Sequence, residues 1–321
     1  MPGLFLLVKG LVREERAAFG SRANAAKSEI EAGIARLAGD LTRQEAEARE
    51  RAAAVDVTLP GRRPRPGGLH PVTIVRRRIE EIFLRMGYSI ADGPELEDDL
   101  HNFAALNFPP EHPARDTQDT LVVDRKAPSP LLLRTHTSPV QIREMKRRGA
   151  PLRIIAPGRV YRKDEVDATH SPLFHQVEAL VVDRGISMAD LKGTVEHFLG
   201  ELFGKGTRVR FIPTFFPFVE PGVDVHMTCF FCRGGQAGDH AAPEAPSGCS
   251  KCKGSGWIEI MGAGEVHPNV LRGVGIDPEE FSGFAFGLGL DRVALLLYEF
   301  PDLRLLFEGD ERFLSQFARE R

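Results

Sequence analysis

The sequence predicts an α+β fold in which an antiparallel sheet is flanked by helices and preceded by a helical arm. Strand-like segments arrive as hairpins, and the helix-like segments stand apart from them without a strict βαβ rhythm. Residues 21–54 lack proline, are rich in Ala, Glu and Arg, and carry a helix pattern. Two Cys-x-x-Cys pairs within residues 229–256 add a small insertion to the predicted sheet.

Composition places the chain among ordinary soluble globular proteins. Of its 321 residues, 42% are hydrophobic and 27% are charged. The formal net charge is −3, so any nucleic-acid partner must be met by a local basic patch or by another subunit. The apolar run Leu4–Val8 is too short for a secretory signal or a membrane span. No later segment approaches the roughly 18 apolar residues that a membrane span needs. We therefore expect a cytoplasmic protein that does not associate with membranes.

The N-terminal helical arm is expected to span residues 1–58. Four apolar residues recur at helical spacing on one face of it, namely Ile30, Ile34, Leu37 and Leu41. This stripe needs a partner surface, and periodicity leaves two alternatives open: a helix packed on its own domain, or half of a helical hairpin or coiled coil. Residues 59–69 read LPGRRPRPGGL and predict a linker, whose arginines either contact phosphate or are simply solvated.

Residues 70–321 are expected to form the main domain. An apolar face over Val72–Met86 predicts a helix that Gly87 ends, and a second helix pattern covers Ser187–Phe203. Phe284–Tyr298 starts glycine-rich and is expected to become helical. Short apolar runs predict strands at Leu121–Val123, Leu131–Leu133, Arg153–Arg162, Val177–Val182, Arg208–Ile212, Val223–Thr228 and Trp257–Met261.

The first candidate site is the strand–loop–strand segment from Gly158 to Glu178. Arg162 ends the first strand, where it can direct its planar guanidinium at a phosphate or carboxylate. Phe174 begins the return strand and offers a flat face on which a base can stack. The simpler alternative is a surface hairpin with exposed ion pairs. Glu178 is harder to explain in that way, because carboxylates are seldom buried unpaired on an apolar strand.

The second candidate site is Gly283–Arg292, which reads GFAFGLGLDR. Small residues let the backbone approach a ligand closely, and Arg292 falls in the first turns of a predicted helix, where phosphate is favoured. A glycine-rich stretch is weak evidence alone. Its spacing to an arginine at an apolar helix start strengthens the case for an anion site.

Together these segments resemble motifs 2 and 3 of class II aminoacyl-tRNA synthetases, and the sequence around them is similar to that of bacterial-type phenylalanyl α subunits. The likeness covers about His70–Phe317 and runs through Arg134–Pro139, Pro157–Arg162, Asp167–His170, Phe174–Glu178, Phe216–Gly222, Gly262–Asn269 and Gly283–Gly287. Motif 1 would be the helix from Val72 and the strand that leads to Pro94. The resemblance implies the class II fold. It also implies activation of phenylalanine with ATP to phenylalanyl-adenylate and transfer to tRNA(Phe).

The resemblance also implies an ATP site, residue by residue. Arg162 and Arg292 would be the catalytic cations: Arg162 grips the α-phosphate and the substrate carboxylate, and Arg292 covers adenine and meets the γ-phosphate. His170 would reach the phosphates, and Phe174 would stack under adenine. Glu220 matches an acidic residue associated with Mg²⁺. Such a site suits the chemistry, because two anions must be brought together and no protein nucleophile is needed.

An amino-acid site is implied by the same resemblance. The matching residues are His136, Ser138, Gln176 and Glu178 for the ammonium and carboxylate, Phe216 and Phe218 for the phenyl ring, and Val219, Ala285 and Gly287 for the pocket lining. Taken singly, such Phe and His residues are more often ordinary core or surface residues. An apolar pocket rejects the hydroxyl of tyrosine by only about a hundredfold. Editing elsewhere is then expected, and the family places it on the β subunit.

The cysteines form a separate signal: Cys229, Cys232, Cys249 and Cys252. Sixteen residues separate the two pairs, which suits a tetrahedral Cys₄ zinc site, and glycines nearby permit tight turns. The alternatives are four free thiols or an iron–sulfur site. The family pattern does not require this insertion. We therefore expect a structural Zn²⁺ in an added knuckle over residues 229–256.

Two features depart from the family pattern. Asp164 and Asp291 stand where the family commonly has Glu, which keeps the charge but shortens the reach. Residues 1–15 resemble the middle of the family's arm, with its first helix missing, so that either the arm is shortened or the start of the sequence is misassigned.

The partners implied are a β subunit in an (αβ)₂ heterotetramer, tRNA(Phe), ATP and phenylalanine. One rival hypothesis is a non-catalytic, synthetase-like paralogue that acts as a binding or regulatory module. Retention of Arg162, Glu178 and Arg292 argues against it. Another is a self-sufficient synthetase of different specificity, which the expected lack of an anticodon-binding domain after Phe317 disfavours.

Overall fold

The protein is described by a computed structural model that covers residues 10, 12–56, 58, 61, 67–115, 120–124, 126–127, 130–231, 249 and 251–318. The chain divides into two compact units, Met1–Arg65 and Pro66–Arg321. Most of the expected linker, with its three arginines, lies outside the described residues. The domain boundaries expected from the sequence stay predictions. Among the described residues, no helix is both long enough and apolar enough to cross a bilayer.

The described residues of the first unit form a long helix, α2 (Arg13–Ala53), which confirms the predicted helical arm. The helix begins earlier than the sequence pattern indicated, and Glu14 and Glu15 lie in its first turn, where negative charge is favoured. The four apolar residues of the predicted stripe are each more than half exposed. Within the first unit, the described residues therefore do not cover this stripe, and the two alternatives stay open.

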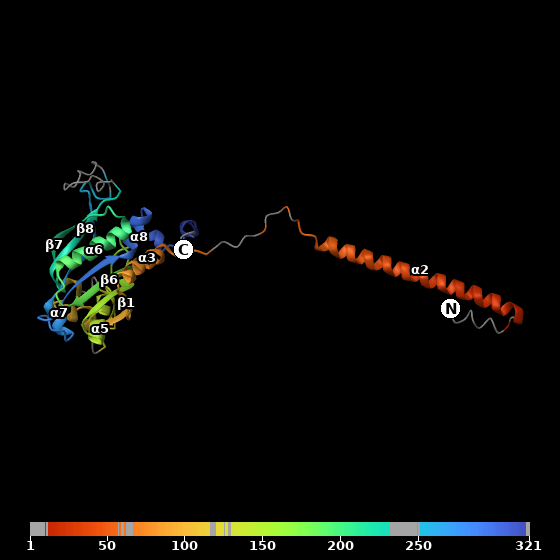
Figure 1. The fold of residues 1–321 in the computed structure, drawn as a ribbon, viewed down its shortest axis with the longest axis horizontal. Helices are drawn as coiled ribbons and strands as arrows, with labels where there is room; N and C mark the ends of the chain where they lie inside the picture. The colour runs from red at the N-terminus through yellow and green to blue at the C-terminus, as the bar shows by residue number, and fades with distance from the viewer. Residues whose placement is uncertain are drawn as a thin grey trace. The chain divides into compact units, whose positions relative to one another are not determined.

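The second unit is built on a seven-stranded sheet, which confirms the predicted α+β class (Figure 1). Its strands, in spatial order, are β1 (Ser89–Ile90), β5 (Leu152–Tyr161), β6 (Leu173–Asp183), β10 (Ser282–Gly289), β9 (Trp257–Val266), β8 (Val219–Thr228) and β7 (Val209–Phe216). Only the β1–β5 pair is parallel. A small second sheet has the order β2 (Leu96–Asp98), β4 (Leu131–Leu133) and β3 (Val122–Asp124).

Three helices cover one face of the large sheet: α3 (Pro71–Arg85), α6 (Met188–Phe203) and α8 (Leu290–Tyr298) (Figure 1). Their contact is dominated by aromatic rings. The ring centroid of Phe83 on α3 lies 4.8 Å from that of Phe198 on α6 and 5.9 Å from that of Phe286 on β10. This face is therefore a dry, close-packed core.

The other face is covered by α5 (Ser138–Arg148) and by short elements, and it holds a second apolar cluster. Successive side chains of a strand point to opposite faces, so Val177, Ala179 and Val181 of β6 face the first core, whereas Leu180 and Val182 face the second. The remaining helices are short: α4 (Asp99–Asn102), η2 (Ala104–Leu106), η3 (Pro113–Arg115), α7 (Pro268–Gly273), η4 (Leu303–Leu306), α9 (Glu311–Leu314) and η5 (Ser315–Phe317).

Helix boundaries follow local signals that the sequence carries. His70 precedes Pro71 and caps α3, because its Nδ1 accepts from the Val72 amide at 3.3 Å. Gly87 follows the helix with a φ of 83°, a left-handed conformation that glycine adopts without strain. The helix α6 begins in a capping box made by Ser187 and Asp190. The helices predicted at Val72–Met86 and Ser187–Phe203 are confirmed to within one residue.

The segment Phe284–Tyr298 differs from the expectation, because it begins with a full central strand, β10, before α8 starts. The strand was missed because it is glycine-rich and buried on both faces, so it lacks polar–apolar alternation. Its glycines allow close approach to β6. A Cβ added at Gly283 would lie 2.3 Å from the Val181 carbonyl oxygen, and one added at Gly287 would lie 2.9 Å from Glu178 Cγ.

Phe83→Ala is expected to destabilise the folded chain by roughly 3–5 kcal/mol, because it removes a ring that is 1% exposed from the contact of three elements. Leu84→Ala is the matched control, because the neighbouring Leu84 on the same helix is 52% exposed and should cost less than about 0.5 kcal/mol. Urea unfolding followed by circular dichroism checks both. Equal midpoints for the two variants would contradict the packing described.

Candidate functional site

A cavity of about 470 Å³ opens on the face of the sheet that carries α5. Nine of the residues expected from the sequence line it: His136, Ser138, Arg162, Gln176, Glu178, Phe216, Phe218, Ala285 and Gly287. They come from the start of α5, the end of β5, the strands β6 and β10, and the β7–β8 hairpin. The pairing of strands that are distant in the sequence therefore brings these residues to one place.

Glu178 is the central acidic group of the cavity, and it is only 5% exposed. Its carboxylate accepts from the Thr137 amide at 3.1 Å, the Ser138 hydroxyl at 2.5 Å and the Gln141 amide nitrogen at 2.7 Å. Burial raises the pKa of Glu178 to about 7, although these donors and two nearby arginines favour the charged form. Glu178 is therefore an acceptor whose charge changes near neutral pH, which suits a cationic ligand.

Two further polar side chains face the cavity without protein partners. Both ring nitrogens of His136 and Oε1 of Gln176 are buried, and none of the described residues hydrogen-bonds them. Burial, aided by the charge of Arg162, lowers the pKa of His136 to about 3, so its imidazole is neutral. The ring stacks on Phe108 with centroids 6.1 Å apart. Because an unsatisfied buried polar group is costly, these atoms point to a polar ligand.

An aromatic slot forms the apolar part of the cavity. The rings of Phe216 and Phe218 lie with centroids 5.8 Å apart and planes 19° apart, and the ring of Phe108 lies 5.7 Å from that of Phe218. Gly262 on β9 makes room for this arrangement, because a Cβ added there would lie 2.9 Å from Cζ of Phe216. Ala285 also lines the slot. The shape and chemistry suit an aromatic side chain.

Val219 does not line the cavity, contrary to the expectation. It is 2% exposed and packs against β9, where a Cβ added at Gly264 would lie 2.7 Å from its own Cβ. The pairing of β8 with β9 shifts register between Val219 and Gly222. Such an irregularity re-aims side chains. The regular alternation of side chains along β8 therefore does not predict which face of the sheet Val219 points to.

Arg162 lies at the rim, between the cavity and Phe174. Its Nε donates to the Thr135 carbonyl at 3.1 Å, and its guanidinium carbon lies 5.1 Å from the Phe174 ring centroid. Its backbone amide donates to the Pro172 carbonyl at 3.0 Å, which closes the hairpin. Asp164 also lines the cavity. A cation held in this way can reach both a ligand in the cavity and one stacked on Phe174.

Three expected residues lie outside the cavity and are exposed: His170, Glu220 and Arg292. His170 is near the hairpin tip, where its Nδ1 lies 3.0 Å from Asp167 Oδ2. That contact and the hydrogen bonds from Thr169 hold the pKa of Asp167 below its ordinary value. Arg292 is the third residue of α8, and its Nη2 donates to the Glu259 carbonyl at 3.3 Å.

Some cavity residues were not expected from the sequence. Gln141 had a usable signal, because it follows Ser138 by three residues on a helix and so shares its face. Phe103 and Phe108 had none, since they come from short irregular turns around η2. Asp291, which precedes Arg292, is not a cavity residue: it is 2% exposed, and its Oδ1 lies 3.2 Å from His175 Nδ1.

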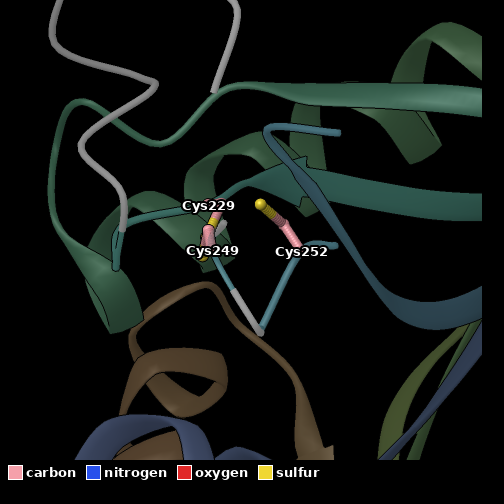
Figure 2. A group of neighbouring side chains, drawn as sticks. All are labelled: Cys229, Cys249 and Cys252. Carbon is pink, nitrogen blue, oxygen red and sulfur yellow. The ribbon is translucent and has the colours of Figure 1, made fainter. Parts of the chain in front are cut away.

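The cysteine site is partly described. Sulfur atoms of Cys229, Cys249 and Cys252 all lie within 4.8 Å of one another, and Figure 2 shows Cys252 reaching toward the other two. The Cys229–Cys249 separation is 3.9 Å. That is close to the edge of about 3.8 Å that a tetrahedron with Zn–S bonds of about 2.3 Å requires. Cys232 lies outside the described residues.

The comparisons with known proteins agree with this geometry. Residues 54–317 match the family model described as "tRNA synthetases class II core domain (F)". The chain is 51% identical over 318 residues to a protein of Caldicellulosiruptor saccharolyticus, covering 97% of this chain and 89% of the relative. It is 52% identical to proteins of Pelobacter propionicus, covering 97% and 88%, and of Pseudomonas fluorescens SBW25, covering 96% and 86%.

Each of these relatives is named phenylalanine–tRNA ligase alpha subunit. The family model covers the whole α+β domain that carries the cavity, and the relatives extend the match over almost the full chain. The chain belongs to the class II aminoacyl-tRNA synthetases, in the family of phenylalanine–tRNA ligase alpha subunits.

Proposed function

We propose that the chain activates phenylalanine with ATP to phenylalanyl-adenylate and transfers the phenylalanyl group to tRNA(Phe). One observation carries this proposal: the lining of one cavity combines a buried carboxylate, buried polar atoms that the described residues leave without hydrogen bonds, and the rings of Phe216 and Phe218. An α-amino acid with a phenyl side chain combines the complementary charge, polarity and aromatic surface. Membership of the family supports the same substrate.

In this proposal the ammonium group of phenylalanine binds Glu178, with Ser138 and Gln141 holding the carboxylate of Glu178 in place. Gln176 and the neutral ring of His136 contribute hydrogen bonds to the polar end of the substrate. The phenyl ring lies against the rings of Phe216 and Phe218, beside Ala285 and Gly287. Each of these residues lines the cavity.

The chemical step is in-line attack of the phenylalanine carboxylate on the α-phosphorus of ATP. A carboxylate oxygen forms the new P–O bond while pyrophosphate leaves, so charge develops around the phosphorus. Arg162 is placed at the cavity rim to offset it. Arg292, Phe174 and His170 would hold the nucleotide outside the cavity. A terminal ribose hydroxyl of tRNA would then attack the acyl carbon, and AMP would leave.

Mg²⁺ and the exposed carboxylate of Glu220 belong to the same proposal. Mg²⁺ is usually held by one or two carboxylates together with substrate phosphates and water, so a single exposed Glu fits its requirements. Bound there with ATP, the ion would supply charge neutralisation for the phosphates.

We also propose that Cys229, Cys232, Cys249 and Cys252 hold a structural Zn²⁺. The three described thiols are spaced for a tetrahedral ion, and Cys229 and Cys252 belong to the apolar core. Glycines at 254 and 256 have positive φ, which allows the tight turn that brings Cys252 back to Cys229. Four thiolate ligands leave no open position for chemistry.

The proposed assembly is an (αβ)₂ heterotetramer in the cytoplasm. The relatives' name, alpha subunit, implies a second kind of subunit. The net charge of −3 fits a division in which a β subunit supplies much of the tRNA contact.

Phenylalanine-dependent ATP–pyrophosphate exchange tests the proposed reaction, with the chain co-expressed with its β subunit. Arg162→Ala should lower the exchange rate by roughly 10²–10³-fold, because a cation that stabilises developing charge is lost. Arg153→Ala is the control, since Arg153 lies at the other end of β5 in an exposed ion pair with Asp183 at 3.6 Å. No exchange in the wild-type complex would contradict the proposed function.

The value of kcat/KM for phenylalanine should rise about tenfold between pH 6 and pH 8. The folded-state pKa of Glu178 is raised to about 7, so the carboxylate is largely neutral below that pH and charged above it. Glu178→Gln should remove this pH dependence and raise KM for phenylalanine roughly 10–100-fold. Asp183→Asn, at the exposed end of the same strand, should leave the profile unchanged. A pH profile retained in Glu178→Gln would refute the assignment.

Freshly purified, reduced protein should contain about one zinc per chain by mass spectrometric metal analysis. Cys252→Ser should lose the metal and lower the melting temperature, because Cys252 is a proposed ligand that is 5% exposed in the core. Ser255→Ala, in the same turn, should keep the metal. Substoichiometric zinc in the wild type would indicate free thiols instead.

A further inference from the structure

Asp291 and His175 form a buried contact between α8 and β6 that the proposed chemistry does not itself use. Asp291 is 2% exposed, and its carboxylate accepts from the backbone amide of His175 and lies 3.2 Å from His175 Nδ1. His175 directly follows Phe174, and Asp291 directly precedes Arg292. The contact therefore joins the neighbours of two residues that the proposed function places at the nucleotide.

The position of this contact in the sheet explains why a carboxylate is needed there. Pairing of β10 with β6 ends at Gly289 opposite Gln176, and the chain then turns into α8. The next amide of β6, that of His175, therefore lacks a carbonyl partner from β10. The Asp291 carboxylate takes the place of that carbonyl. This hydrogen bond holds the first turn of α8 against β6, just beyond Gln176, where the pairing of β6 with β10 ends.

The contact between Asp291 and His175 bears on the relative positions of Phe174 and Arg292. The side chains of Phe174 and Arg292 are at least partly open to solvent, and they project from the two elements that the Asp291–His175 contact joins. A side chain on a helix start or a strand can be held more accurately than one on a loop, provided that the two elements are fixed relative to each other. A small displacement of groups that position a substrate can cost a large factor in rate.

We propose that Asp291 is a positioning residue that sets the spacing between Phe174 and Arg292, and so the fit of the enzyme to ATP. This inference rests on the proposed function, in which the nucleotide lies between these two side chains. Asp291 itself does not touch the substrate.

The test compares KM values for ATP and for phenylalanine in ATP–pyrophosphate exchange by the complex with the β subunit. Asp291→Ala removes both contacts and should raise KM for ATP at least tenfold, while KM for phenylalanine changes less than twofold. Asp291→Asn keeps an oxygen that accepts from the His175 amide and should restore KM for ATP to within about threefold of the wild type. His175→Ala removes only the ring contact and should raise KM for ATP two- to threefold.

Val293→Ala is the matched control for a merely structural effect, because Val293 is fully buried on the same turn of α8. It should lower the melting temperature without changing KM for ATP. The proposal is overturned if Asp291→Ala raises both KM values equally, or if Val293→Ala raises KM for ATP as much as Asp291→Ala does. Should Asp291→Ala not assemble, an unchanged KM for ATP in His175→Ala overturns it. Absence of exchange in the wild-type complex would instead reject the proposed function.

Discussion

The cavity depends on one physical constraint: a carboxylate buried in a sheet must be supplied with hydrogen-bond donors. Glu178 receives them from the segment that begins α5, through the Thr137 amide and the side chains of Ser138 and Gln141. These bonds fix the start of α5 against β6. Gly287 leaves room on the other side, so that β10 can lie against the same carboxylate. The hydrogen bonds to Glu178 and the close approach of the β10 backbone therefore shape the same wall of the cavity.

The two faces of strand β10 have different roles, one in the apolar core and one in the cavity. Because side chains alternate along a strand, Phe284 and Phe286 of β10 enter the core under α3 and α6, whereas Ala285 faces the other cluster and lines the cavity. On β10, the two rings build the apolar core on one face, and the small residues Ala285 and Gly287 leave space for a ligand on the other. The same strand therefore supports the fold and shapes the site without a conflict between the two.

The proposed nucleotide side is built differently from the amino-acid side. Its residues lie at a strand end, a hairpin tip and a helix start, where they are exposed and can meet a large anionic ligand. Arg162 belongs to both sides, since it lines the cavity and lies over Phe174. Its place at the boundary suits a reaction in which the carboxylate of one substrate attacks the phosphate of the other.

The sequence by itself determined the features that depend on neighbours in the chain. It predicted α3, α6 and the helical end of Phe284–Tyr298 from apolar patterns and a glycine stop, but not α5, and its linear motifs predicted nine residues that line one cavity. Tertiary structure decided what depends on distant segments. It made β10 a central strand, turned Val219 into the core at a register shift, buried Asp291 against His175, and brought Phe103 and Phe108 to the site. Local patterns carry no information on such placements, because strand pairing and packing fix them only when the whole sheet has formed.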